Sequence, residues 1–322
     1  MRSRLARSIA LTVLAGIPAL AFAQTWPSRT ITVINGFSPG STFDITARAY
    51  AAEIQKRLGV SIINESRPGV ANLIASYAVA RAAPDGYTFF FGSQTLTSSV
   101  FIKNNPIVVP RDLTPVADLQ GSPQYVYVRS SLSVNNYDDL VAYAKANPQK
   151  LNYGSTAGPI GEMMVHLLSK SKPGVTYTYV PFKGTPEVVN SMLNGEIDFT
   201  IATIGPFLPQ VQAGKLKVIL SMGEKPSSVP AFASVPLAKD NGFSVRLGSG
   251  TGYWAPGATP PDIIQKMGDA AIAALAVPEV VAVVRNTGSE PDPRPAAAAL
   301  QNYIDTQKYW QEAAKATGFQ PQ

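Results

Sequence analysis

The sequence of 322 residues contains no cysteine and a single histidine, His166. Without cysteine the chain has neither a disulfide framework nor a thiolate nucleophile. One histidine cannot supply a two-histidine metal centre or a Cys/His metal cluster. His166 lies in a helical pattern without evident triad partners, so we interpret it as a partly buried helix residue. We expect no metal, no cofactor and no catalytic residue.

Long apolar runs are also missing, apart from Ile9–Leu20 near the N-terminus. That run is shorter than the ~20 residues that span a bilayer. It follows three arginines and precedes Ala21-Phe22-Ala23, a small-x-small cleavage pattern. These features are typical of a secretory signal peptide, so we predict that residues 1–23 are removed and that the mature protein is periplasmic. An N-terminal membrane anchor is the alternative.

The excess of positively over negatively charged residues is small. Removal of the three arginines lowers the number of Lys plus Arg from 27 to 24 against 21 Asp plus Glu, so the net charge falls from +6 to +3. This bias is spread along the chain and does not form the basic stripe of a nucleic-acid-binding protein. A mature chain of about 300 residues is too long for a single hydrophobic core and favours two domains of ~150 residues. We expect a monomer that does not bind nucleic acid.

The first half of the chain contains a regular alternation of strand-like and helical patterns. Apolar runs at Ile31–Ile34, Val60–Asn64 and Tyr87–Gly92 are separated by helical periods at Asp44–Leu58 and Asn72–Ala83. This β-α-β-α-β order predicts a doubly wound, mainly parallel sheet with helices on both faces. In such sheets ligands bind beyond the carboxyl ends of the strands.

The stretch Val33–Arg48 forms one such end. It reads as a short strand, a turn with Gly36 and Gly40, and the start of a helix. Free amides and the positive end of the helix dipole point the same way at this corner, which favours an anion. We expect Asp44 to have a structural role, in which its carboxylate interacts favourably with the helix dipole or holds the loop amides. The candidate ligand-binding residues here are Phe37, Ser38, Pro39, Gly40, Ser41, Thr42, Phe43 and Asp44.

A second corner repeats this order. The strand Leu151–Tyr153 runs into a Gly/Ser/Thr turn and then the helix Glu162–Lys170. Two such corners on different lobes can hold one anion from both sides. The candidates here are Ser155, Thr156, Ala157, Gly158 and Gly161. Lys183 could pair with a ligand carboxylate, although a solvated or loop-bracing cation is an equally good reading.

Features of an enzyme site are weak. The run Gly248–Gly252 lacks the lysine and Ser/Thr of a phosphate loop and the spacing of a dinucleotide fold, so we interpret it as a flexible segment near the domain interface. No Gly-x-Ser-x-Gly elbow occurs, and Ser41 has no general base nearby in the sequence.

Ordered motifs along the mature chain resemble the Bug family, the extracytoplasmic solute-binding receptors of tripartite tricarboxylate transporters. The motifs cover nearly the whole mature chain and occur in the order and spacing of that family. They are Phe37-Ser38-Pro39-Gly40, Arg67-Pro68-Gly69, Ala83-Pro84-Asp85-Gly86-Tyr87-Thr88, Tyr153-Gly154-Ser155, Val180-Pro181-Phe182-Lys183-Gly184, Gly195-Glu196-Ile197-Asp198-Phe199, Ala213-Gly214-Lys215-Leu216, Ala255-Pro256 and Thr259-Pro260.

The resemblance implies a two-lobed α/β periplasmic binding protein of type II. Such a protein clamps a small carboxylate between its lobes and delivers it to integral-membrane transporter subunits. We expect the first lobe to comprise residues 24–122 and 226–322 and the second residues 123–225. The C-terminal helices are expected to pack on the outside of the first lobe. A ligand sensor for a signalling partner, and an enzyme on the same fold, are the alternatives.

The chain departs from the family at several candidate positions. Ser41 replaces a second glycine, and Phe43 replaces a small polar residue. Thr203 stands where many members carry aspartate. Thr203 and Gly184, which follows Lys183 in the Lys-Gly motif, complete the set of candidate ligand-binding residues. Met163 occupies the place of a common histidine, so His166 does not inherit that role. Because Phe43 offers an aromatic face and Thr203 no counter-charge for an amine, we favour an aromatic or apolar-bodied mono- or dicarboxylate over an aliphatic dicarboxylate.

Overall fold

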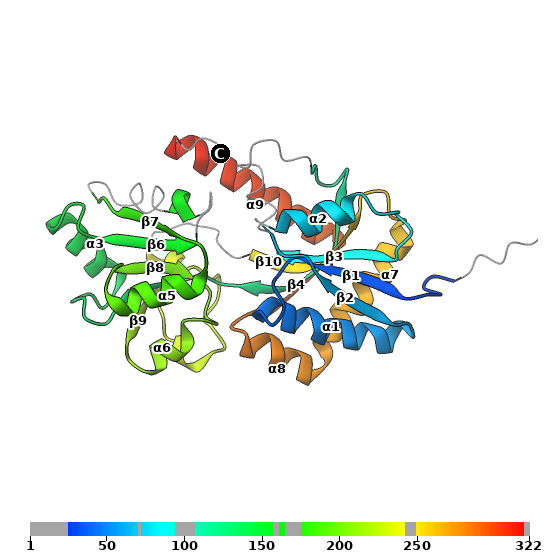
Figure 1. Ribbon diagram of the computed structural model, residues 1–322, viewed down its shortest axis with the longest axis horizontal. Coiled ribbons are helices and arrows are strands. Elements are labelled where there is room, and N and C mark those ends of the chain that lie inside the picture. Colours follow the sequence, from blue (N-terminus) through cyan, green and yellow to red (C-terminus); the bar gives the residue numbers. More distant parts are fainter. Residues whose placement is uncertain are drawn as a thin grey trace, which may run out of the picture.

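The computed structural model describes residues 25–69, 72–93, 107–156, 161–164, 175–241 and 249–318. Two separate β-sheets lie side by side, and helices cover both faces of each (Figure 1). The predicted two-lobed α/β class is therefore confirmed, and each sheet with its helices is called a lobe below. The predicted signal peptide, residues 1–23, and His166 lie outside the described residues.

The first lobe contains a six-stranded sheet with the order β11-β4-β10-β3-β1-β2. Helices α1, α7 and α8 pack on one face, and α2 and the first part of α9 pack on the other. Its elements are β1 (Ile31–Asn35), α1 (Thr42–Leu58), β2 (Ile62–Ser66), α2 (Leu73–Ala80), β3 (Thr88–Ser93), β4 (Leu113–Ser122), β10 (Ser249–Pro256), α7 (Pro261–Ala273), η5 (Ala274–Ala276), α8 (Pro278–Asn286), β11 (Glu290–Pro295) and α9 (Ala296–Thr317).

The second lobe contains a five-stranded sheet with the order β7-β6-β8-β5-β9. One face carries α3, and the other carries α5 and a cluster around Tyr127 and Phe232. Its elements are β5 (Tyr125–Arg129), α3 (Tyr137–Ala146), β6 (Asn152–Thr156), β7 (Thr178–Phe182), α5 (Thr185–Asn194), β8 (Phe199–Ala202), α6 (Leu208–Gln212), β9 (Leu216–Ser221), η3 (Pro230–Phe232) and η4 (Ala238–Asn241).

Both sheets are mixed. The predicted parallel pairing holds for β1 with β2 and β3, and for β6 with β7 and β8. The remaining pairs, which involve β4, β5, β10 and β11, are antiparallel. Only Pro123 and Gln124 separate β4 from β5, so the chain passes directly from one sheet into the other. The parallel part of each sheet is thus built from βαβ units. The antiparallel part contains β4 or β5, the two strands at the crossing from one sheet to the other.

Strand β10 lies in the middle of the first sheet. The sequence predicts a flexible segment at Gly248–Gly252, yet residues 249–252 all pair with β4, and Thr251 and Gly252 pair with β3 as well. Gly248 lies outside the described residues. A Cβ on Gly252 would collide with the carbonyl oxygen of Ala117 in β4. Glycine here permits close backbone packing, and this explains a glycine-rich run inside a central strand.

The segment after β9 stays on the second lobe. The sequence predicts a return to the first lobe at residue 226, but Phe232 and Val235 pack in the cluster that contains Tyr127. Leu237 also forms a parallel bridge with Ser221 of β9. Because these apolar side chains are buried against the second sheet, we propose to extend the second lobe to about Asn241.

Helix α9 contacts both lobes, whereas the sequence predicts only that it packs on the outside of the first lobe. Near its start, the Tyr303 ring lies edge-on to Trp254 of β10, with a centroid distance of 5.6 Å. Further along, Trp310, Ala313 and Ala314 belong to the core cluster of the second lobe. The helix is 22 residues long and reaches across the junction (Figure 1). It therefore ties the two hydrophobic cores together.

Within the described residues, no single helix has the length and apolar character needed to cross a membrane. The consecutive segments Pro261–Ala276 and Pro278–Asn286 meet these two criteria only as a pair, and they bend by 83° at their junction.

Replacement of Trp310 by alanine tests the attachment of α9 to the second lobe. Trp310 is 3% exposed, so Trp310→Ala should lower the free energy of unfolding by about 3 kcal/mol, through lost burial and the cavity left behind. Urea unfolding followed by circular dichroism measures this change. The exposed neighbour Gln311 provides the control, because Gln311→Ala should change the stability by less than about 0.5 kcal/mol. Equal effects of the two changes would contradict the packing of α9 on both lobes.

Candidate functional site

The first corner is built as the sequence predicts, from the end of β1, a turn and the start of α1. Ser41 is the N-cap of α1, and its hydroxyl accepts a hydrogen bond from the Asp44 amide at 3.3 Å. The amides of Thr42 and Phe43 have no acceptor among the described residues. The start of α1 points toward the junction of the lobes (Figure 1). Free amides at a helix N-terminus suit a ligand carboxylate.

A buried carboxylate fixes the shape of this turn. Asp44 is 3% exposed, and its Oδ2 accepts the amide of Gly40 at 2.9 Å and Nε of Arg48 at 3.0 Å. Its Oδ1 accepts Nδ2 of Asn35 at 2.9 Å and the hydroxyl of Ser66 at 3.4 Å. Four donors from the strand ends, the turn and α1 therefore converge on one side chain. Asp44 lies beneath the loop, where it can order the loop amides.

The environment of Asp44 also sets its ionisation. Burial by itself raises the pKa of this carboxyl group. Hydrogen bonds from Arg48 and Gly40, the charge of Arg48 and the hydrogen bond from Asn35 outweigh burial, so that the pKa lies below its usual value of 3.8. The group is thus ionised at neutral pH and its negative charge is fully engaged.

Two aromatic rings flank the turn. Phe37 and Phe43 are stacked, with ring centroids 4.3 Å apart and an interplanar angle of 20°. Both are partly buried, whereas Ser38, Pro39 and Gly40 between them are exposed. The sequence singled out Phe43 as an aromatic surface, but the stacking with Phe37 emerges only in the structure. The pair forms an apolar wall beside the free amides of α1.

Asn72 and Ser93 are further residues at this corner that were not among the sequence candidates. Asn72 is the N-cap of α2 and is 6% exposed, and its Nδ2 donates to the Ser93 hydroxyl at 3.4 Å. A Cβ on Gly36 would collide with the Asn72 side chain, so Asn72 lies directly against the turn. The sequence signal was its place at the start of a helix that follows a parallel strand.

The second corner lies at the end of β6. Ser155 is 7% exposed, and its hydroxyl hydrogen-bonds to the carbonyl of Thr156 at 3.2 Å and to the Tyr179 hydroxyl at 3.4 Å. Gly161 lies in a helical stretch of which residues 161–164 are described, and a Cβ there would collide with the Ser155 hydroxyl. The structure therefore brings Ser155, Thr156 and Gly161 together and adds Tyr179. The candidates Ala157 and Gly158 lie outside the described residues.

The remaining candidates lie in loops of the second lobe. The Lys183 amide donates to Oε2 of Glu187 at 3.0 Å, and Gly184 is the N-cap of α5. Thr203 follows β8, and its carbonyl accepts the Tyr127 hydroxyl at 3.3 Å. These loops follow the carboxyl ends of β7 and β8, as the second corner follows β6. Lys183, Gly184 and Thr203 therefore lie at the same edge of the second sheet as Ser155.

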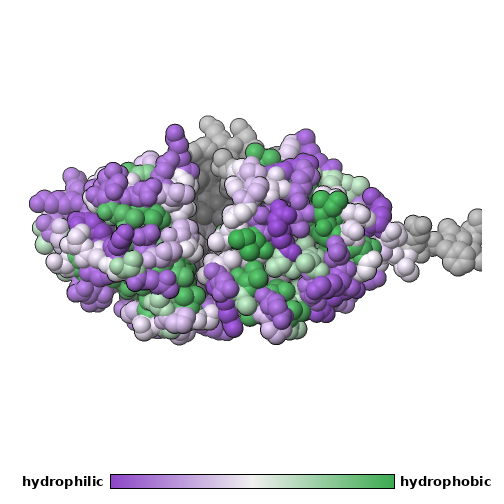
Figure 2. All heavy atoms as spheres, turned by 60° about the horizontal axis from the view of Figure 1, so that its bottom comes forward, coloured by the Kyte–Doolittle hydropathy of each residue, from purple (hydrophilic) through white to green (hydrophobic). Residues whose placement is uncertain are grey.

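A hollow separates the two lobes on the face seen in Figure 2. In Figure 1 the end of β6 and the start of α1 approach this junction from opposite sides. The two corners predicted from the sequence therefore belong to different lobes and face the junction between them. This arrangement suits a small ligand held between both.

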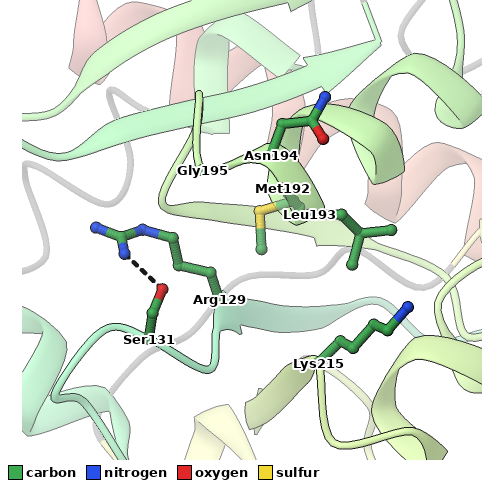
Figure 3. A pocket seen from close by; sticks show the side chains of 7 residues that line it. All are labelled: Arg129, Ser131, Met192, Leu193, Asn194, Gly195 and Lys215. Atoms are coloured by element: carbon green, nitrogen blue, oxygen red, sulfur yellow. Dashed lines mark hydrogen bonds between the residues drawn. The ribbon is translucent and has the colours of Figure 1, made fainter.

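Two pockets are lined by residues other than those of the two corners. One, of about 520 Å³ and shown in Figure 3, has Arg129 and Lys215 in its wall, but Nε of Arg129 already pairs with Asp198 at 2.9 Å. The other, of about 530 Å³, lies between β11, α9 and the loop after β9, where Arg294 pairs with the buried Asp118 at 3.5 Å. The described residues contain no group of three or more His, Asp or Glu side chains that could hold a metal ion.

Proteins of known sequence and structure resemble this chain over most of its length. A protein encoded in the gbd 5' region of Cupriavidus necator is 31% identical over 320 residues, which cover 98% of this chain and 92% of that protein. The solved structure of Rpa4515 from R. palustris with adipate has a TM-score of 0.79 and 27% identity, with 92% of this chain and 100% of that chain covered. MatC from Rhodopseudomonas palustris with bound malate has a TM-score of 0.73 and 28% identity, with 89% and 99% covered.

The family of tripartite tricarboxylate transporter receptors matches residues 46–318. This range includes α1 from Thr46 onward, both sheets apart from β1, and the second corner. The match confirms the resemblance drawn from the ordered motifs and identifies a family of binding proteins, not enzymes. The chain belongs to the family of tripartite tricarboxylate transporter receptors.

Proposed function

We propose that this chain is a periplasmic receptor that captures a small carboxylate by lobe closure and delivers it to the membrane subunits of a tripartite tricarboxylate transporter. The observation that carries the proposal is the N-terminus of α1, which lies at the junction of the lobes and where the amides of Thr42 and Phe43 lack acceptors among the described residues. The proposal includes removal of residues 1–23 on export. Relatives in complex with adipate and with malate support the carboxylate class.

The donors suit an ionised ligand. A carboxylate removed from water needs hydrogen-bond donors, since a buried anion without them is costly. Amides of α1 provide such donors on one side. On the other side the Ser155 hydroxyl, which here donates to the Thr156 carbonyl and the Tyr179 hydroxyl, can rotate toward a ligand. A hydrogen bond to a charged group contributes about 1.5–3 kcal/mol, and the helix dipole adds about 0.3–1 kcal/mol. These contributions are strongest once closure excludes water.

For the body of the ligand we favour an aromatic or otherwise apolar skeleton. The stacked rings of Phe37 and Phe43 lie within a few residues of the free amides. A carboxylate held by these amides would place its carbon skeleton near the ring pair. Aromatic contacts of this kind add about 0.5–1.5 kcal/mol to area burial.

A panel of carboxylates tests the class of ligand by thermal denaturation of the mature protein. At one hundred times its Kd a ligand stabilises the folded state by about 2.7 kcal/mol. We expect terephthalate and benzoate to raise the Tm more than adipate and malate at equal concentration. Stabilisation by aliphatic diacids alone would reject the aromatic preference. Failure of every carboxylate would reject the proposed function.

The variant Phe43→Leu tests the aromatic wall. It should weaken binding of an aromatic carboxylate about tenfold, the upper part of the range for ring contacts, because leucine retains apolar volume but has no ring face. Isothermal titration calorimetry gives the two dissociation constants. Adipate serves as the internal control, and its affinity should change by less than threefold. A similar loss for both ligands would indicate a general effect on the loop.

The variant Asp44→Asn tests the order of the loop. An amide group would face the donors of Gly40 and Arg48, so unfolding should become easier by about 1–3 kcal/mol near neutral pH. The variant should also bind the carboxylate more weakly, because Gly40 loses its acceptor. Chemical unfolding and titration calorimetry measure the two effects.

The difference in stability between the wild type and Asp44→Asn depends on pH in a defined direction. The pKa of Asp44 is lower in the folded state than its usual 3.8, so its stabilising contribution is complete above about pH 4 and is lost as the pH falls through the folded-state pKa. The stability gap between the wild type and Asp44→Asn should therefore narrow in acid. Asp269→Asn, on the exposed side of α7, is the control and should show no such gap.

A further inference from the structure

The loop after β8 brings the second lobe into contact with the candidate ligand corner. A Cβ placed on Gly205 would lie 3.2 Å from Cγ2 of Thr42 and 3.4 Å from the carbonyl oxygen of Thr287. Thr42 is the first residue of α1, beside the free amides, and Thr287 follows α8. Gly205 therefore lies against two elements of the opposite lobe, with little room for a side chain.

The loop that carries Gly205 is held firmly on its own lobe. Ile204 is 1% exposed, and its carbonyl accepts the amides of Phe207 and Leu208, both at 2.9 Å. The Phe207 ring stacks on Tyr127 with a centroid distance of 4.5 Å, and the Tyr127 hydroxyl donates to the carbonyl of Thr203 at 3.3 Å. The loop is thus anchored on both sides of Gly205 and cannot retreat without disturbing the core of the lobe.

The opposing surface on the first lobe is equally close. Gly288 has φ +77°, and a Cβ there would lie 2.6 Å from Cβ of Ile204. Its amide donates to the carbonyl of Arg285 at 2.8 Å, which closes the end of α8. The contact continues two residues later, where Glu290 accepts the amide of Ser228 of the second lobe at 2.6 Å. The two lobes therefore meet along the loop between α8 and β11.

We propose that Gly205 is a positioning residue for ligand binding, because the absence of its side chain sets how closely the second lobe approaches the N-terminus of α1. This inference rests on the proposed function, in which the carboxylate lies at those amides. Gly288 supports the same approach from the first lobe, and the pair acts as the stop at which closure ends.

The consequence for the ligand follows from hydrogen-bond geometry. Donors from two lobes can reach one carboxylate only if each lies within about 2.7–3.2 Å of an oxygen. A side chain at position 205 would meet Thr42 before the lobes reached their present separation. The cleft would then stay wider, and donors of one lobe would lose contact with the ligand. Gly205 thus keeps the donors of both lobes within reach of one ligand.

A disulfide test uses the absence of cysteine from the natural chain. The double variant Thr42→Cys/Gly205→Cys places two thiols at the proposed contact, where a Cβ at position 205 lies 3.2 Å from Cγ2 of Thr42, a γ position like that of a cysteine sulfur. A disulfide needs such close approach, with Cβ atoms about 3.5–4.5 Å apart. We expect a crosslink on mild oxidation, seen as a mobility shift on a non-reducing gel. Saturating adipate or terephthalate should speed its formation at least threefold if either probe binds.

The control pair Thr42→Cys/Ala146→Cys has its second thiol at the end of α3, on the outer side of the second lobe (Figure 1). This pair should crosslink at least tenfold more slowly. Equal rates for the two pairs, or no crosslink for the Gly205 pair, would overturn the proposed contact. The comparison does not depend on the identity of the ligand.

The variant Gly205→Val then tests the consequence for affinity. It should raise the Kd of whichever probe the wild type binds, adipate or terephthalate, by at least tenfold. The Tm of the ligand-free protein should stay within about 2 °C, because the lobes can separate slightly to admit the valine while the core of each lobe stays intact. Ala213→Val, at the exposed end of α6 in the same lobe, should leave the Kd unchanged. Wild-type affinity in Gly205→Val would overturn the role of Gly205.

The outcomes separate this inference from the proposed function. If the wild type binds neither probe and the Gly205 pair still crosslinks, the ligand class fails and the closure contact stands. If the wild type binds a probe but Gly205→Val binds it equally well, the receptor function stands and the positioning role fails.

Discussion

The carboxylate of Asp44 is the constraint on which the candidate site depends. It accepts hydrogen bonds from Asn35, Gly40, Arg48 and Ser66, and so joins the ends of two strands, the turn and α1. Because this group occupies the centre of the turn, it is not itself available to a ligand. The remaining amides at the start of α1 face outward without acceptors among the described residues. The buried negative charge of Asp44 thus orders a surface that suits a second negative charge, that of a ligand carboxylate.

The arrangement of the lobes gives this corner its opposite wall. The chain crosses directly from β4 to β5, and α9 attaches to both hydrophobic cores through Tyr303 and Trp310. The lobes are therefore joined by packed elements, which favour motion about a limited set of axes. On the proposed function, close contact at Gly205 and Gly288 sets the end of that motion, and binding and closure are one structural event.

Local sequence signals predicted the parts of the fold in which neighbouring residues determine the structure. The alternation that includes Ile31–Ile34 and the glycine turn before α1 have clear periodicity and turn chemistry. Strands β4, β10 and β11 gave no such signal. β10 contains Gly250 and Gly252, and β11 contains three prolines, so neither shows the composition of a strand. They are strands because distant neighbours provide their hydrogen-bond partners, as the contact between Gly252 and Ala117 illustrates.

The sequence by itself determined the family, the two lobes and the chemistry of the α1 corner, because ordered motifs and a helix start are local features. It could not determine that Phe37 stacks on Phe43, that Asn72 lies against Gly36 or that Gly205 meets Thr42. Those contacts join side chains whose separation depends on how strands pair and how the lobes pack. No spacing along the chain encodes such distances, and only the assembled tertiary structure decides them.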